Sequence, residues 1–208
     1  MEREYKWKLT AGSVQALAAY LHEYPARLAQ DTVHMSAVYY DTAAGHVHAQ
    51  GGALRIRREN DRSVCCLKRT VKKEGAQALR EEYETEAADV HEGLLRLAES
   101  GAPRELCIFL SAQPMQEIAR TEFIRNWYLI ENRDVAPFTA EFAIDVGALG
   151  ISGNMEPFEE LELELKSGDA DAFQAFANAL EQRFLLIPQP ASKLARAIAV
   201  TGKGKQND

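Results

Sequence analysis

Acidic side chains recur at every second position near both ends of the chain. Glu2 and Glu4 form one such pair, and Glu162 and Glu164 form another. Residues two apart on a β-strand point to the same face, so each pair presents its two carboxylates together. Mg²⁺ sites in proteins usually combine one or two carboxylates with the phosphate oxygens of a substrate. The pairs therefore indicate a site for a hard divalent cation.

Basic side chains follow the same spacing on other segments. Arg55 and Arg57 share one face of an expected strand, and Lys6 follows the first acidic pair. The planar guanidinium fork of arginine matches the oxygens of a phosphate group, which lysine binds as a point charge. Lys68 and Arg125 are further basic residues in segments where polar and apolar residues alternate. Acidic and basic rows together indicate a ligand that joins phosphate groups to a metal ion.

A sheet with one solvent-facing side would show the same alternation of charged and apolar residues, and that explanation suffices for any single strand. It does not explain why like charges are grouped within strands, because a solvated surface is better served by mixed charges. A row of like charge is instead neutralised by a ligand of opposite sign. Arg80, Glu82 and Glu84 also share a face, and Asp145 lies between two apolar residues. These four residues are therefore candidates for the same site.

Strand-like alternation recurs in eight segments, which are the elements that must hold these side chains. The expected strands cover residues 2–9, 36–41, 53–59, 63–70, 79–87, 122–131, 138–146 and 159–166. Helices are expected at residues 13–24 (with Ser13 as the cap), 90–100 and 114–119, from Asp169 onward, and from Ser192 onward. Trp7 and Trp127 are expected to pack against the helices. Mostly antiparallel strands with helices in the connections define an α+β protein.

Properties of the whole chain limit the classes of function. Its 208 residues fit one domain, expected over residues 1–200, with a flexible tail at 201–208. The net charge of −7 argues against nucleic-acid binding. No apolar run is long enough to span a membrane, and the N-terminus lacks the apolar segment of a signal peptide. The three cysteines have neither zinc-ligand nor disulfide spacing, so a reducing compartment, the cytoplasm, is expected.

The order of these motifs resembles the CYTH superfamily of triphosphate tunnel enzymes. Its N-terminal ExExK signature is matched by Glu2, Glu4 and Lys6. Similar segments follow in the same order: YYDTAAGHVHAQGGALRIRREN (39–60), CCLKR, REEYE (80–84), TEFIRNWY, FAIDVG, EELELELKSGD (159–169) and ASKLAR (191–196). The segments are most similar to those of bacterial inorganic triphosphatases, without the helical CHAD domain that some relatives carry. The resemblance implies a closed antiparallel β-barrel of about eight strands, a tunnel with a charged interior and with helices packed outside.

The resemblance also implies roles for the matching positions. The residues that would hold one or two Mg²⁺ or Mn²⁺ ions are Glu2, Glu4, Asp145, Glu162 and Glu164, to which we add Glu82 and Glu84. The residues that would bind the phosphates are Lys6, Arg55, Arg57, Lys68, Arg125 and Lys193, to which we add Arg80 and Arg196. We expect Lys6, Glu4 and Arg57 to act at the reacting atoms, with Lys6 helping to position the attacking water.

The expected activity is metal-dependent hydrolysis of inorganic tripolyphosphate to pyrophosphate and phosphate, by a monomer or homodimer whose partner is this small molecule and neither nucleic acid nor membrane. Hydrolysis of thiamine triphosphate or a nucleotide is a second interpretation, and cyclisation of ATP, as in class IV adenylyl cyclases, is a third. A module that binds polyphosphate or nucleotides without turnover is the non-enzymatic alternative. A pure anion-binding protein gains nothing from carboxylates that face its ligand, so the acidic pairs favour catalysis.

Overall fold

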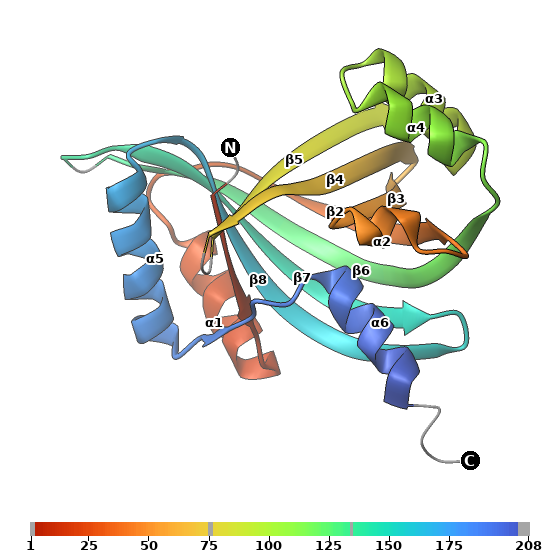
Figure 1. Ribbon diagram of the computed structural model, residues 1–208. Helices are drawn as coiled ribbons and strands as arrows, with labels where there is room; N and C mark the ends of the chain where they lie inside the picture. Colours follow the sequence, from red (N-terminus) through yellow and green to blue (C-terminus); the bar gives the residue numbers. More distant parts are fainter. Residues whose placement is uncertain (1–2, 75–76, 134, 204–208) are drawn as a thin grey trace.

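One antiparallel sheet of nine strands organises the molecule (Figure 1). A computed structural model describes residues 3–74, 77–133 and 135–203, without the side chains of residues 70–74, 77–80 and 201–203. The hydrogen-bonded order of the strands is β5-β4-β3-β2-β6-β7-β8-β1-β9. The strands are β1 (Glu4–Lys8), β2 (Arg27–Thr42), β3 (Gly52–Glu59), β4 (Arg62–Glu74), β5 (Gln77–Glu86), β6 (Met115–Asn132), β7 (Phe138–Ile151), β8 (Asn154–Gly168) and β9 (Ile187–Pro188). Each of the eight segments that were expected to be strands overlaps one of the strands β1 to β8, and the α+β class is confirmed.

The prediction of a closed barrel is wrong, because the sheet is open, with β5 and β9 at its edges. The short strand β9 pairs with the side of β1 that faces away from β8, and it places Trp7 opposite Pro188. The Gln189 N–H extends this contact by donating to the Lys6 carbonyl at 2.8 Å. Since β9 already occupies that edge of β1, β5 cannot pair there, and Pro188 has no N–H to offer another strand. The sheet nevertheless curves strongly, so that both of its halves face a common space (Figure 1).

Two helices cover the convex face of β1 and β6 to β8, as the amphipathic patterns predict. They are α1 (Ala11–His22) and α5 (Ala170–Phe184). Asp169 caps the N-terminus of α5 by accepting hydrogen bonds from two backbone N–H groups. The core that they share with the sheet includes Trp7, Phe142, Leu163 and Phe173. The Trp7 indole N–H donates to Glu181 at 2.7 Å, which fixes β1 against α5.

A second group of helices covers the convex face of β3 to β5. These are α2 (His46–Ala49), α3 (Val90–Glu99) and α4 (Arg104–Ser111). Leu94 and Leu110 from α3 and α4 pack with Leu54 and Leu67 from the sheet in a buried core. At Gly93 an added Cβ would lie only 2.3 Å from the Cβ of Cys65. The close packing of α3 on β4 therefore requires glycine at this position.

The last helix, α6 (Lys193–Lys203), departs from the expectation that every helix packs outside. It lies against the concave face of β6, β7 and β8, where Ala197 and Val200 join Met35, Phe123 and Phe158 in a small apolar cluster. This cluster, which also contains Ala37, Tyr39, Ala119 and Leu149, is called the α6 cluster below. The helix continues to Lys203, past the expected domain boundary at residue 200, and residues 204–208 of the expected tail lie outside the described residues.

Three local expectations differ from the structure. Residues 115–119, expected within a helix, begin β6 and pair with β2, because a long sheet ladder outweighs a weak helical pattern of six residues. The cap of α1 is Thr10, whose hydroxyl accepts from the Ser13 N–H, so the helix begins earlier than the Ser13 signal indicated. Trp127 faces the concave side, because no irregularity separates it from Arg125 in the β6–β7 register.

None of the helices in the described part of the chain is long and apolar enough to span a membrane.

Candidate active site

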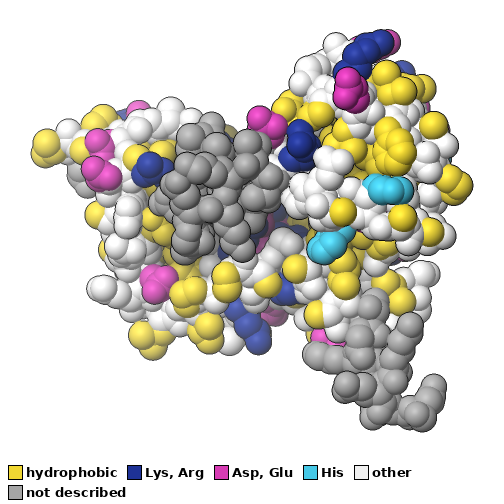
Figure 2. Space-filling model, in the orientation of Figure 1, with side chains coloured by type: hydrophobic (Ala, Val, Ile, Leu, Met, Phe, Trp, Pro, Cys, Tyr) yellow, Lys and Arg dark blue, Asp and Glu magenta, His cyan; other side chains and the backbone are white. Residues whose placement is uncertain are grey.

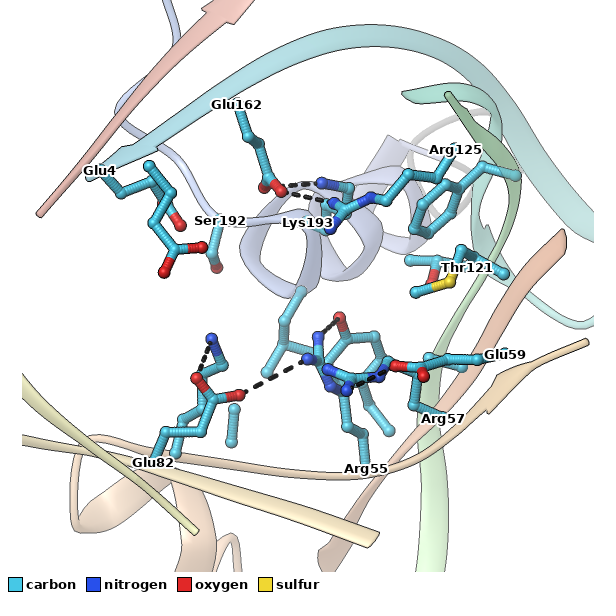
Figure 3. A pocket seen from close by; sticks show the side chains of 18 of the residues that line it. Glu4, Arg55, Arg57, Glu59, Glu82, Thr121, Arg125, Glu162, Ser192 and Lys193 are labelled. Carbon is cyan, nitrogen blue, oxygen red and sulfur yellow. Dashed lines mark hydrogen bonds and ion pairs between the residues drawn. The ribbon is translucent and has the colours of Figure 1, made fainter. Parts of the chain in front are cut away.

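A cavity of about 570 Å³ lies on the concave side of the sheet, and charged side chains line most of it (Figure 3). One wall comes from β3 to β5, the other from β1 and β6 to β8, and the start of α6 borders both. Among the residues that the structure describes, the lining includes seven Lys or Arg residues and seven Glu residues, so the formal charges of this part cancel. Basic and acidic side chains are visible in the hollow between the two ends of the molecule, beside residues that are not described (Figure 2).

The register of the strands explains why these side chains meet. β1 and β8 place Glu4 opposite Glu164 and Lys6 opposite Glu162. β6 and β7 place Arg125 opposite Asp145. Directly opposed residues of antiparallel strands have neighbouring side chains on the same face. The alternation in the sequence thus becomes adjacent acidic and basic rows on the concave surface.

Arg125 and Asp145 form a bidentate ion pair on the wall that β1 and β6 to β8 provide. The Arg125 guanidinium donates to both oxygens of Asp145, at 2.8 and 2.7 Å, and also to Glu162 at 2.5 Å. Asp145 is completely buried. A bidentate arginine–carboxylate contact fixes the orientation of both groups, so the Arg125 side chain is held in one position at the cavity wall.

Lys193 lies at the centre of three carboxylates. Its Nζ is 2.9 Å from Asp145, 2.5 Å from Glu160 and 2.8 Å from Glu162, and Arg196 donates to the second oxygen of Glu160. These residues and Arg125 form a buried network of three acids and three bases, which is called the α6 network below. The network has no net formal charge, so its charges are compensated without any ion.

Burial and ion pairing act in opposite directions on the acids of the α6 network. Burial opposes ionisation of Glu162, but Lys193 and Arg125 outweigh it and hold the pKa of that carboxyl well below its usual range. For Glu160, which is completely buried, desolvation prevails over the Lys193 and Arg196 charges and the pKa is raised. Of these two carboxylates, Glu162 is the one that lines the cavity, where Arg125 and Lys193 hold it.

The opposite wall carries a second set of ion pairs. Lys68 Nζ lies 2.8 Å from Glu82, and Arg57 lies 2.6 Å from Glu59 and 3.0 Å from Glu84. Burial works to raise the pKa of Glu82, but the Lys68 ammonium beside it lowers the pKa to about 2.

Two arginine atoms of this wall lack partners. The Nε atoms of Arg55 and Arg57 are buried, and neither donates a hydrogen bond within the described part of the chain. Leaving such a donor unpaired costs free energy, on the order of 1–3 kcal/mol. Both arginines line the cavity, so an anion placed there would supply the missing acceptors.

Near β1, the cavity is also lined by residues to which the sequence analysis gave no role, Glu141 and Lys166. Lys6 contacts Glu4 at 2.5 Å, and Lys166 contacts Glu164 at 2.8 Å and Glu141 at 3.3 Å. Glu59, Glu141 and Lys166 lie an even number of residues from Arg57, Asp145 and Glu164, so each shares a strand face with a residue that was assigned to the site. This spacing was the signal in the sequence that could have identified them. Other lining residues without an expected role include Tyr39, Thr121 and Ser192.

Most of the predicted site residues line the cavity together, and the remaining four do not appear among the lining residues. Those that line it are Glu4, Lys6, Arg55, Arg57, Lys68, Glu82, Glu84, Arg125, Glu162, Glu164 and Lys193. Asp145 is not part of the lining but contacts Arg125 and Lys193, which are, whereas Arg196 contacts Glu160, which lies outside the lining. Glu2 and the side chain of Arg80 lie outside the described part of the chain.

The donor atoms present suit a hard divalent cation. Ligand oxygens of Asp145, Glu160 and Glu162 lie within 4.8 Å of one another, and Glu82 and Glu84 form a similar group with the Cys66 thiol. Carboxylate oxygens are the ligands that Mg²⁺ and Mn²⁺ prefer. The carboxylates of Glu4 and Glu164 reach the same cavity from neighbouring strands. The residues present therefore fit a divalent ion.

Fold and site together define an α+β protein with an ionic cavity on the concave face of one curved sheet. The chain belongs to the CYTH domain family, whose profile matches residues 1–198.

Solved structures with low sequence identity share this fold. HpAC1 from Hippeastrum, described as a candidate adenylyl cyclase with a dominant triphosphatase activity, is 20% identical, with a TM-score of 0.63 over 98% of this chain and 96% of that chain. PH1819 from Pyrococcus horikoshii is 15% identical, with a TM-score of 0.56 over 96% and 99%. A Bacillus halodurans protein described as a candidate adenylate cyclase is 17% identical, with a TM-score of 0.54 over 92% and 94%.

Proposed function

We propose that this protein hydrolyses a triphosphate with the help of Mg²⁺ or Mn²⁺, and that inorganic tripolyphosphate is its substrate, released as pyrophosphate and phosphate. The observation that carries the proposal is a cavity lined by both arginines and carboxylates, in which the Nε atoms of Arg55 and Arg57 are buried and have no partner among the described residues. The arginines would bind an anion, and the carboxylates would bind a cation. A metal–triphosphate complex supplies both.

The balance of charge supports the need for a metal. Because the formal charges of the cavity lining cancel, a highly charged anion entering alone would find as many repulsive as attractive groups. Divalent ions that travel with the triphosphate would be held by Glu4, Glu162 and Glu164, with Glu2 and Asp145 as further ligands. Glu82 and Glu84 would hold a second ion on the opposite wall. A divalent ion held by these carboxylates would supply positive charge that stabilises the phosphate oxygens during hydrolysis.

The basic residues of this chain bind and orient the phosphate groups. Arg55, Arg57 and Lys68 contact them from one wall, and Arg125 and Lys193 from the other, with Arg80 and Arg196 in support. Guanidinium groups already fixed by ion pairs need little reorganisation when charge moves during the reaction, which is the source of their electrostatic effect.

Lys6 and Glu4 are the groups we assign to the attacking water. Their side chains are in contact at 2.5 Å and they border the cavity on β1. A water hydrogen-bonded to this pair from the cavity side would be oriented toward the phosphorus, while Arg57 stabilises the opposite end of the phosphate chain. Replacement of Lys6 by alanine should lower kcat; a change in KM alone would show that Lys6 only binds substrate.

The character of the lining favours an inorganic substrate over an organic one. Its main apolar members, including Met35, Ala37 and Phe123, are at least nine-tenths buried in the α6 cluster. They leave little apolar surface for a thiamine or nucleoside group. The dominant triphosphatase activity ascribed to the Hippeastrum relative also favours hydrolysis over cyclisation of ATP.

The test is release of phosphate from tripolyphosphate, thiamine triphosphate, ATP and pyrophosphate, each with Mg²⁺, Mn²⁺ or EDTA. The Glu162→Gln/Glu164→Gln variant removes the acidic pair, and Glu131→Gln, at an exposed ion pair, is the matched control. Metal-dependent cleavage of tripolyphosphate that only the double variant loses is the expected result. Formation of cyclic AMP would establish the cyclase alternative, and binding without turnover would establish a binding module.

A further inference from the structure

Thr121 is a buried polar residue on the cavity wall that neither the motifs nor the proposed mechanism uses. The residue is 1% exposed, and its hydroxyl has no hydrogen-bond partner among the described residues. It nevertheless lines the cavity, where Figure 3 places it between Arg125 on one side and Arg57 on the other. A buried hydroxyl without a partner is uncommon, and it calls for an explanation.

The surroundings of Thr121 on the sheet offer no acceptor side chain. Its neighbours two positions away on β6 are Ala119 and Phe123, and the residues opposite it are Ala37 on β2 and Leu149 on β7. All four belong to the apolar α6 cluster. The hydroxyl can therefore gain a side-chain or ligand acceptor only from the cavity side.

The strand register places Thr121 in one row with Arg57. Ala37 pairs with Arg57 on β3 and with Thr121 on β6, so the small alanine side chain separates the two polar groups. Neighbouring strands lie about 4.8 Å apart, which puts the backbones of Arg57 and Thr121 roughly 10 Å from each other. Ala37, Arg57 and Thr121 all line the cavity, and the Nε of Arg57 is, like the Thr121 hydroxyl, buried and without a partner among the described residues.

We propose that the Thr121 hydroxyl donates a hydrogen bond to a terminal phosphoryl group of the bound triphosphate, opposite Arg57. This inference rests on the proposed function. The group is terminal because the packed residues of the α6 cluster surround Thr121 on the sheet and leave no room for the chain to continue. Thr121 is thus a substrate-binding residue that marks the end of the phosphate chain and orients its last phosphorus.

Two substitutions separate this role from a structural one. Thr121→Val keeps the shape and removes the hydroxyl, whereas Thr121→Ser keeps the hydroxyl and removes the methyl group. The free Val variant should melt no lower than the wild type, since it no longer buries an unpaired hydroxyl. Its Kd for tripolyphosphate with Mg²⁺, measured by calorimetry, should rise about tenfold, the effect of one hydrogen bond to a charged group. The Ser variant should bind within about twofold of the wild type.

The outcomes distinguish this inference from the proposed function. Equal affinity of the wild type and the Val variant would overturn the role of Thr121 and leave the proposed function intact. Weak binding by both variants would also overturn it, because loss of the methyl group would then account for the effect. A wild type that binds no tripolyphosphate would overturn the proposed function, and this inference with it. If the Val variant does not fold, Thr121→Ala, which also lacks the hydroxyl, replaces it in the same comparison with Ser.

Discussion

Replacing Asp145 by asparagine should destabilise the protein severely even though the side chain keeps its size and shape. Asp145 is completely buried, and it accepts from Arg125 at 2.8 and 2.7 Å and from Lys193 at 2.9 Å. The amide of the substituted side chain would turn one acceptor into a donor that faces another donor. It would also leave the α6 network with two acids for three bases, and an uncompensated buried charge costs about 3–5 kcal/mol.

The assay is urea unfolding of the metal-free protein in EDTA, followed by circular dichroism, so that no bound ion contributes. The variant Asp145→Asn/Arg125→Met restores two acids and two bases. It should be less destabilised than the sum of the single variants, by about 2 kcal/mol. Glu131→Gln, which breaks an ion pair with an arginine that is 71% exposed, should change stability by less than about 0.5 kcal/mol.

Two results would refute this reasoning. A cost below about 1 kcal/mol for Asp145→Asn would mean that solvent reaches the network and compensates its charges. Strict additivity in the double variant would mean that Arg125 and Asp145 do not depend on each other, contrary to their bidentate contact.

Other outcomes concern the thiols, one carboxyl and two glycines. Burial raises the pKa of the Cys65 and Cys66 thiols from 9.0 to about 12, so alkylation at pH 8 should be about 1,000-fold slower in the native than in the unfolded protein; similar rates would contradict their burial. The pKa of Glu82 is lowered from 4.5 to about 2, so its carboxylate stabilises the metal-free protein above about pH 4.5 and loses this effect as the pH falls toward 2. In urea titrations, Glu82→Gln should cost about 3 kcal/mol at pH 6 and clearly less at pH 3, whereas an equal cost at both would exclude this linkage. The new Cβ of Gly147→Ala would lie 2.2 Å from a β6 carbonyl oxygen and should lower stability by about 2 kcal/mol or more in thermal melts. Gly12→Ala, whose Cβ meets nothing within 4 Å, should raise it by about 0.5–1 kcal/mol, and a similar response of both would show that the contact is absent.

The strands were predictable because their signal is local. Alternation of charged and apolar residues marks β1, β3, β5 and β8, and the same rule assigns Arg55, Arg57 and Lys6 to the concave face. What alternation cannot provide is that the sheet stays open. That depends on β9, a strand of two residues that pairs with β1 from far along the chain, and two residues carry no periodic pattern.

The site was predictable to the extent that its residues carry charge. Glu4, Glu162 and Lys193 stand in recognisable motifs, and the structure brings them to one cavity. The contact of Lys193 with three carboxylates was not predictable, because it depends on α6 packing inside the sheet. Thr121 was not predictable either, since a single threonine on a strand has no distinguishing pattern until its neighbours are known.

The position of Lys193 has a consequence for the order in which ligands arrive. Its ammonium rests where three carboxylate oxygens converge, which is the place a divalent ion would take. In the metal-free protein, the ammonium of Lys193 on α6 thus neutralises these carboxylates. A metal ion that arrives without phosphate must compete with this ammonium for them. Phosphate oxygens are the partners able to draw that ammonium away. Metal and phosphate should accordingly enter together, and the lysine would act as a placeholder that keeps the acidic strands folded between turnovers.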